Sequence, residues 1–197
     1  MILRFLLILF SFVPTAWSND DCFPPEVLPD NLFPTVRMET SLGDVVVELN
    51  RMRAPATVNN FLGYVLDGSY DGTIFHRVIS GFVVQGGGYG PDFSERGVNA
   101  PVLNESGNGL QNDMGTIAMA RFDDPHSATR QFYFNLGDNS SLDPNSRNWG
   151  YTVFGTVLEG RDVLESMAEV TTDYSEALGA TDVPVDPLIL IRVSITE

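Results

Sequence analysis

The segment FHRVISGFVVQGG, residues 75–87, carries the most informative pattern in this sequence of 197 residues. It places a single arginine, Arg77, among apolar residues and a glutamine, Gln85, and glycines at 81 and 86–88 punctuate it. The segment contains no nucleophile beside a base and no spacing typical of metal ligands. An arginine among apolar and amide side chains predicts chemistry by placement of charge on a neutral substrate, which an apolar pocket would hold.

Two later segments agree with the first in order and distance. One is GTIAMA at 115–120 with SATRQFYF at 127–134, and the other is GYTVFG at 150–155. Together the three resemble the signature segments of the cyclophilins, the peptidyl-prolyl cis/trans isomerases, and are most similar to the exported bacterial branch. Three ordered motifs are more specific than one glycine pattern. The resemblance runs from about Thr35 to the C-terminus.

The periodicity of apolar residues predicts a mainly β fold. Alternation over 44–50 and 189–195 is typical of half-buried strands, and shorter candidate strands lie at 73–76, 82–85, 116–120, 132–135 and 152–158. Spacing of three and four residues predicts a helix through Val58 and Val65 and another through Val163 and Val170. Many short strands with two helices favour a closed β-barrel capped by the helices. The resemblance implies that the barrel is antiparallel, with about eight strands.

The resemblance also implies an active site. Arg77 is the expected catalytic residue, because a charged donor aimed at the prolyl nitrogen would stabilise the twisted amide. The residues at the positions that bind substrate in the family are Phe82, Val83, Gln85, Ala120, Arg121, Gln131, Tyr133, Leu142 and Tyr151. No metal or cofactor is expected. Val83 stands where the family has a methionine, Tyr133 where it has a phenylalanine, and Tyr151 where many members have a histidine.

Strand parity supports part of this assignment. Gln131, Tyr133 and Asn135 point to one side of a strand and Phe132 and Phe134 to the other. We therefore expect Gln131 and Tyr133 to share a solvated groove while the two phenylalanines fill the barrel. Val83 and Gln85 also share a face. Residue 82 falls on the other face, unless the chain bends near residue 81.

Other interpretations of the same residues remain open. Arg77 could pair with one of the many carboxylates, and His76 is expected to be a buried strand histidine because the reaction transfers no proton. Asp123, Asp124 and His126 are more typical of an exposed turn than of a metal site. An alternative function is a non-catalytic module that binds proline-containing peptides, or a chaperone, on the same fold. A serine hydrolase is disfavoured, because the sequence has two histidines and no nucleophile-elbow motif.

The N-terminus predicts export. Residues 1–18 have a positive start, an apolar run and a small-x-small cleavage site, which is the pattern of a signal peptide. Residues 19–34 are proline-rich and predict a flexible lead, and 35–197 form the expected isomerase domain. A periplasmic location follows, or secretion in an organism without a periplasm. Cys22 is the only cysteine, so no intrachain disulfide can form.

The charge of the chain limits its partners. It has 26 acidic residues against 11 arginines and no lysine, for a net charge of −15. Such a chain repels nucleic acid and anionic membranes, so neither is an expected partner. We expect a monomer that binds unfolded or partly folded polypeptides containing proline.

Overall fold

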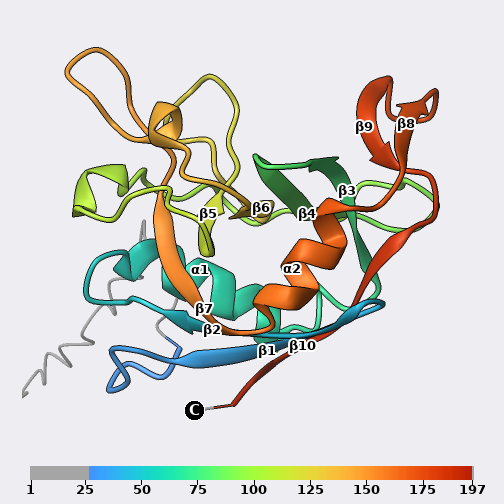
Figure 1. Ribbon diagram of the computed structural model, residues 1–197. Helices are drawn as coiled ribbons and strands as arrows, with labels where there is room; N and C mark the ends of the chain where they lie inside the picture. Colours follow the sequence, from blue (N-terminus) through green and yellow to red (C-terminus); the bar gives the residue numbers. More distant parts are fainter. Residues whose placement is uncertain (1–26, 197) are drawn as a thin grey trace, which may run out of the picture.

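The computed structural model describes residues 27–196 and contains a closed antiparallel β-barrel (Figure 1). The barrel strands follow one another around it in the order β1, β10, β3, β4, β6, β5, β7 and β2. Their bounds are β1 Thr35–Thr40, β2 Gly43–Leu49, β3 Thr73–Ile79, β4 Val83–Tyr89, β5 Thr116–Met119, β6 Phe132–Asn135, β7 Val153–Glu159 and β10 Leu188–Ile195. Eight strands in a closed antiparallel barrel confirm the predicted fold.

The barrel interior is filled by large apolar side chains. Phe132 and Phe134 of β6 are fully buried in the main core, together with Phe75 of β3 and Phe154 of β7. The rings of Phe75 and Phe132 meet edge to face with their centroids 6.1 Å apart, a favourable aromatic geometry. The predicted inward side of β6 is therefore correct, and the barrel encloses a packed core.

Two α-helices complete the core. Helix α1 spans Pro55–Leu66 and buries Phe61 and Leu62, and helix α2 spans Arg161–Ala168 and buries Met167. The α1 N-terminus has no side-chain cap from its own segment. Instead, the carboxylate of Glu105, from a distant loop, accepts hydrogen bonds from the backbone N–H groups of Ala56 and Thr57, the second and third residues of the helix, at 3.2 and 2.9 Å. Both predicted helices are confirmed.

The remaining elements are short. Two 3-10 turns, Ser106–Asn108 and Ser140–Leu142, lie in the long loops. A two-stranded hairpin, β8 Thr172–Ser175 and β9 Ala180–Pro184, follows α2, and β9 packs against β3. Figure 1 shows this hairpin projecting from the barrel at the upper right. Neither the hairpin nor β1 was predicted from the sequence. Among residues 27–196 there is no helix of the length and apolarity that crossing a membrane requires.

The signal-peptide prediction lies outside the described residues, as do residues 19–26, which are half of the proline-rich lead. The described part of the lead runs along the barrel. The carbonyl of Leu32 accepts from the backbone N–H of Arg51 at 3.0 Å, and the carbonyl of Pro34 accepts from that of Leu49 at 2.9 Å. The first strand begins at Thr35, at the start of the predicted domain. The division of the chain into signal, lead and domain stays a prediction.

Candidate active site

A β-bulge in β3 turns Arg77 out of the barrel. Phe75 pairs with Gly86 of β4 and Arg77 pairs with Gln85, so His76 is an extra residue on β3. Without it, Phe75 and Arg77 would share a face, because side chains two residues apart on a strand point the same way. The bulge shifts this parity. Phe75 consequently points into the core, while Arg77 lies half-buried on the outer face.

The register of the next strands aligns the site in one row. Gln85 of β4 pairs with Tyr133 of β6, Tyr133 pairs with Ala118 of β5, and Ala118 pairs with Val153 of β7. Residues directly opposite each other on antiparallel strands point to the same face. Arg77, Gln85, Tyr133, Ala118 and Val153 thus form a continuous row across five strands. The row is polar at the β3 end and apolar at the β7 end.

The apolar end of the row is the centre of a second, smaller hydrophobic cluster outside the barrel. Val83, Ala118, Tyr133 and Val153 are buried in it, and Phe82, Leu110, Ala120, Leu142 and Tyr151 pack against it. Six of these nine residues were predicted as substrate-binding. Ala118, Val153 and Leu110 were missed, although the first two lie within the quoted segments GTIAMA and GYTVFG.

Phe82 reaches this cluster from a turn. It precedes β4, and its backbone N–H donates to the carbonyl of Ile79 at 3.0 Å. Gly81 before it adopts φ +70°, the left-handed region that suits glycine. The chain therefore bends where the sequence analysis required a bend, so strand parity does not apply to residue 82.

The hydroxyl of Tyr133 has a buried partner. It donates to Oδ1 of Asn112 at 2.8 Å, and Asn135 also donates to that oxygen, at 3.2 Å. Burial, followed by the nearby Tyr151 and Asp143, raises the pKa of Tyr133 well above its usual value, so the phenol stays neutral. Asn112 lies in the long loop before β5, and nothing in the local sequence pattern indicated its role.

The polar end of the row is held by amide side chains. Arg77 donates through Nη1 to Oε1 of Gln85 at 3.4 Å, and Gln85 donates through Nε2 to Oε1 of Gln131 at 2.8 Å. Across residues 27–196 a single ion pair is found, between Arg37 and Asp44, so Arg77 pairs with none of the described carboxylates. Its guanidinium is thus available to a substrate.

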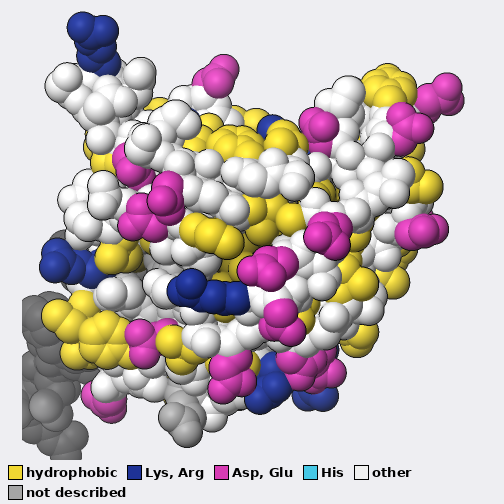
Figure 2. Space-filling view, viewed as in Figure 1, with side chains coloured by type: hydrophobic (Ala, Val, Ile, Leu, Met, Phe, Trp, Pro, Cys, Tyr) yellow, Lys and Arg dark blue, Asp and Glu magenta, His cyan; other side chains and the backbone are white. Residues whose placement is uncertain are grey.

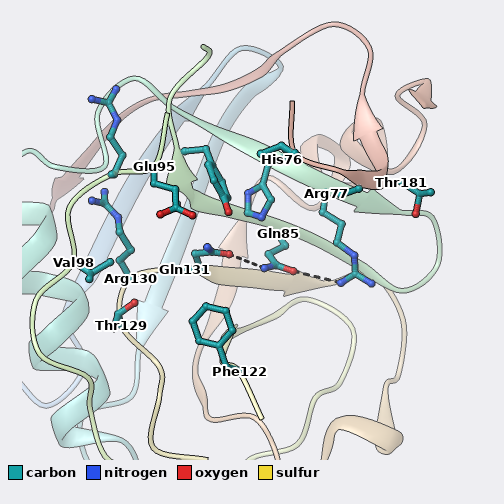
Figure 3. A pocket seen from close by; sticks show the side chains of 15 residues that line it. His76, Arg77, Gln85, Glu95, Val98, Phe122, Thr129, Arg130, Gln131 and Thr181 are labelled. Carbon is teal, nitrogen blue, oxygen red and sulfur yellow. Dashed lines mark hydrogen bonds between the residues drawn. The ribbon is translucent and has the colours of Figure 1, made fainter. Parts of the chain in front are cut away.

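A groove of about 490 Å³ opens beside these residues (Figure 3). His76, Arg77, Gln85 and Gln131 lie along its floor, and Thr181 of the β8–β9 hairpin lies at the Arg77 end. Its other lining residues include Tyr89, Glu95, Val98, Phe122, Thr129 and Arg130. Phe122 is 79% exposed at the rim. The hairpin that the sequence analysis missed therefore forms one wall of the groove.

Arg121 supports the loop that carries Tyr151. Its guanidinium lies 4.5 Å from the centroid of the Tyr151 ring, a cation–π arrangement. It also donates to the carbonyl of Trp149 at 2.9 Å and to that of Gly150 at 3.3 Å. Ala120 lies beside it at the edge of the apolar cluster. The structure thus gives the Arg121 side chain a supporting role at the edge of the predicted binding surface.

The two histidines lie in different surroundings. His76 is buried in the bulge against the ring of Tyr89, with centroids 4.7 Å apart. Burial and, secondly, the charge of Arg77 lower the pKa of His76 to about 4, so its imidazole is neutral at pH 7. His126 accepts at Nδ1 from the backbone N–H of Asn104 at 3.0 Å, and the backbone N–H of His126 donates to Oδ1 of Asp124 at 2.8 Å. The second arrangement is a turn stabilised by side chains.

The acidic residues are spread over the surface. Figure 2 shows Asp and Glu side chains scattered over the visible face of the barrel and along the projecting hairpin, with few arginines between them. Such a field keeps an acidic chain soluble. The groove differs from this surface in charge, because three arginines, Arg77, Arg96 and Arg130, line it and only one carboxylate, Glu95, does.

Comparison with known proteins agrees with this geometry. The family model "Cyclophilin type peptidyl-prolyl cis-trans isomerase/CLD" matches residues 35–194. A peptidyl-prolyl cis-trans isomerase of Streptomyces antibioticus is 53% identical over 159 residues, covering 79% of this chain and 95% of the relative. Peptidyl-prolyl cis-trans isomerase B of Escherichia coli is 43% identical over 165 residues, covering 82% of this chain and 99% of the relative.

Solved structures give the same result. A cyclophilin-type isomerase of Cryptosporidium parvum, crystallised in the presence of the dipeptide Ala-Pro, superposes with a TM-score of 0.71 at 27% identity, covering 83% of this chain and 99% of the other. With the barrel, the row of side chains across it and these relatives in agreement, the chain belongs to the cyclophilin family of peptidyl-prolyl cis/trans isomerases.

Proposed function

We propose that this isomerase accelerates rotation about Xaa-Pro bonds in exported polypeptides, with Arg77 as the donor that stabilises the transition state. The observation that carries the assignment is the outward row of side chains. It sets a guanidinium that makes no ion pair with the described residues beside an apolar cluster on the same face. A cation beside an apolar seat suits proline. The ring can pack in the seat, and its nitrogen becomes a hydrogen-bond acceptor when the amide is twisted.

The chemistry needs no proton transfer and no broken bond to carbon. Rotation about a peptide bond meets a barrier of about 18–20 kcal/mol, which comes from amide resonance. When the bond is twisted, the prolyl nitrogen loses conjugation and its lone pair becomes available. An N–H of Arg77 that donates to this lone pair binds the twisted state more strongly than the planar one, and this difference lowers the barrier.

The apolar cluster would seat the proline ring. Phe82, Val83, Tyr133 and Leu142 supply its walls, and Gln85 would hold the peptide backbone beside Arg77. Because Tyr133 uses its hydroxyl on Asn112, the ring edge facing the seat remains apolar. Val83 is shorter than the methionine common in the family, so we expect the seat to be roomier at this point.

The test compares cis/trans exchange of a short Ala-Pro-Phe peptide, measured by NMR, for the purified protein and two variants. Loss of one donor to a transition state costs about 10²–10³ in rate. We expect a loss of that order for Arg77→Ala and a smaller one for Arg77→Lys, which keeps the charge but loses the planar fork. Peptide affinity should change little. An exchange rate in Arg77→Ala equal to that of the wild type would refute the assignment. Binding without exchange in the wild type would favour the peptide-binding module.

That the substrates are exported proteins is a separate part of the proposal. The signal-like pattern of residues 1–18 supports it. Proline isomerisation takes tens of seconds unaided and can limit folding, so an exported isomerase would serve proteins that fold after translocation. Fusion of residues 1–34 to a phosphatase that is active only outside the cytoplasm should give active enzyme. Activity that depends on an added export signal would contradict this location.

A further inference from the structure

A line of polar side chains continues along the groove beyond the residues assigned so far. The bonds from Arg77 to Gln85 and from Gln85 to Gln131 form its first two links (Figure 3). The amide of Gln131 lies over Gly88, where an added Cβ would stand 2.6 Å from Nε2 of Gln131. Only a glycine leaves room for the amide at that point. The line therefore reaches the end of β4, whose last residue is Tyr89.

The next two residues along the line are Tyr89 and Glu95. The turn at 90–94 returns the chain so that Glu95 lies opposite Tyr89 in an antiparallel bridge, which puts both side chains on one face. Both line the groove with Gln131. Burial raises the pKa of Tyr89, Glu95 raises it further by charge and as a hydrogen-bond acceptor, and Gln131 lowers it as a donor. The bridge and the shared groove thus bring the hydroxyl of Tyr89 near one group that can donate to it, Gln131, and one that can accept from it, Glu95.

The chemistry of the two ends fixes the direction of every link. A guanidinium only donates hydrogen bonds and a carboxylate only accepts them. A Tyr89 hydroxyl that joins this line must therefore donate to Glu95 and accept from Gln131. Gln131 then presents its oxygen to Gln85, and Gln85 presents its own oxygen to Arg77. A glutamine amide has an acceptor on one side and donors on the other, so one orientation of each amide satisfies all the groups in the line.

We propose that Tyr89 and Glu95 are positioning residues, which hold the amides of Gln131 and Gln85 in the orientation that places the Arg77 guanidinium for catalysis. The inference rests on the proposed role of Arg77. Hydrogen bonds in a directed chain polarise one another, so the carboxylate at one end strengthens the bond at the other. The Arg77 link is long at 3.4 Å, and it is expected to tighten when a peptide excludes water from the groove.

Tyr89→Phe is the decisive variant, because it keeps the ring against His76 and removes only the hydroxyl. We expect kcat to fall about three- to tenfold, the size of effect that one hydrogen bond carries, with KM within twofold and an unchanged melting temperature. Tyr174→Phe is the matched control, since Tyr174 is 59% exposed on the hairpin and should keep wild-type activity. In NMR spectra, the side-chain amide signals of Gln85 and Gln131 should move in the first variant alone.

Two further variants test the line of hydrogen bonds itself. Gly88→Ala should displace the Gln131 amide and lower kcat as Tyr89→Phe does, although neither glutamine is changed. Glu95→Gln should lower kcat by itself and add nothing in the double variant with Tyr89→Phe, because both break one chain.

Wild-type kcat in Tyr89→Phe, or additive losses in the double variant, would overturn the inference. If Arg77→Ala abolishes exchange while Tyr89→Phe leaves it intact, only the positioning chain is wrong. If Arg77→Ala is itself active, the proposed function fails first.

Discussion

Burial of His76 in the bulge should make the stability of this protein fall between pH 6.5 and pH 4. In the folded chain its pKa is lowered to about 4, first by burial and then by the charge of Arg77, whereas an unfolded histidine titrates near 6.5. Between these values the unfolded chain binds the extra proton, so stability is lost as the pH falls. At about 1.4 kcal/mol for each unit, the loss reaches about 2 kcal/mol at pH 5 and about 3 kcal/mol below pH 4.

The assay is urea unfolding of the wild type and of His76→Phe at pH 7.5, 6 and 5. Phenylalanine keeps a ring against Tyr89, and Nδ1 of His76 has no hydrogen-bond partner among the described residues, so the variant should fold. Titration of the carboxylates is common to both proteins and cancels in the difference. We expect the free energy of unfolding of the wild type to fall relative to the variant by about 2 kcal/mol between pH 7.5 and 5. A constant difference across that range would refute the reasoning.

Three further changes test the packing around the site. Tyr133→Phe should cost about 1 kcal/mol in urea unfolding, because Asn112 keeps its second donor; a loss above about 3 kcal/mol would contradict this. Gly87→Ala should cost roughly 2–4 kcal/mol, since its φ is +83° and a Cβ would meet Phe132 at 2.9 Å; an unchanged melting temperature would exclude the clash. Glu105→Ala should cost about 1–2 kcal/mol by uncapping α1, and calorimetry should show it as a lower melting temperature.

Much of the barrel could be predicted from local patterns because its strands are half-buried. Phe132 and Phe134 alternate with Gln131 and Tyr133, and this period of two placed each pair on the correct side. The helices were equally readable because their apolar residues recur at helical spacing, although α1 is buried on most sides and only α2 buries a single stripe. The β8–β9 hairpin was not, because its strands are short and only Val183 and Pro184, at the end of β9, are buried. Because its two buried residues are neighbours in the sequence rather than alternating, the hairpin leaves no period of two to detect.

The orientation of Arg77 shows where local patterns fail. Side chains alternate along a strand, so counting from Phe75 would place Arg77 inside the barrel. The one extra residue, His76, reverses that result. A bulge is a single insertion without a period, so its only trace in the sequence is the run of glycines on the facing strand. Asn112 shows a second limit, because its contact with Tyr133 crosses 21 residues of chain and follows from the fold alone.

The packed interior of the barrel decides how a client can approach. Because aromatic rings occupy the inside, a polypeptide can meet this enzyme only sideways, along the outer surface of the strands. Entry from the side requires no free chain end and imposes no limit on length. A proline in the middle of a large, partly folded protein is therefore as accessible as one in a tetrapeptide, provided that a few residues around it are extended. Among a folding client's prolines, local exposure rather than position in the chain would then determine which bonds are turned over first.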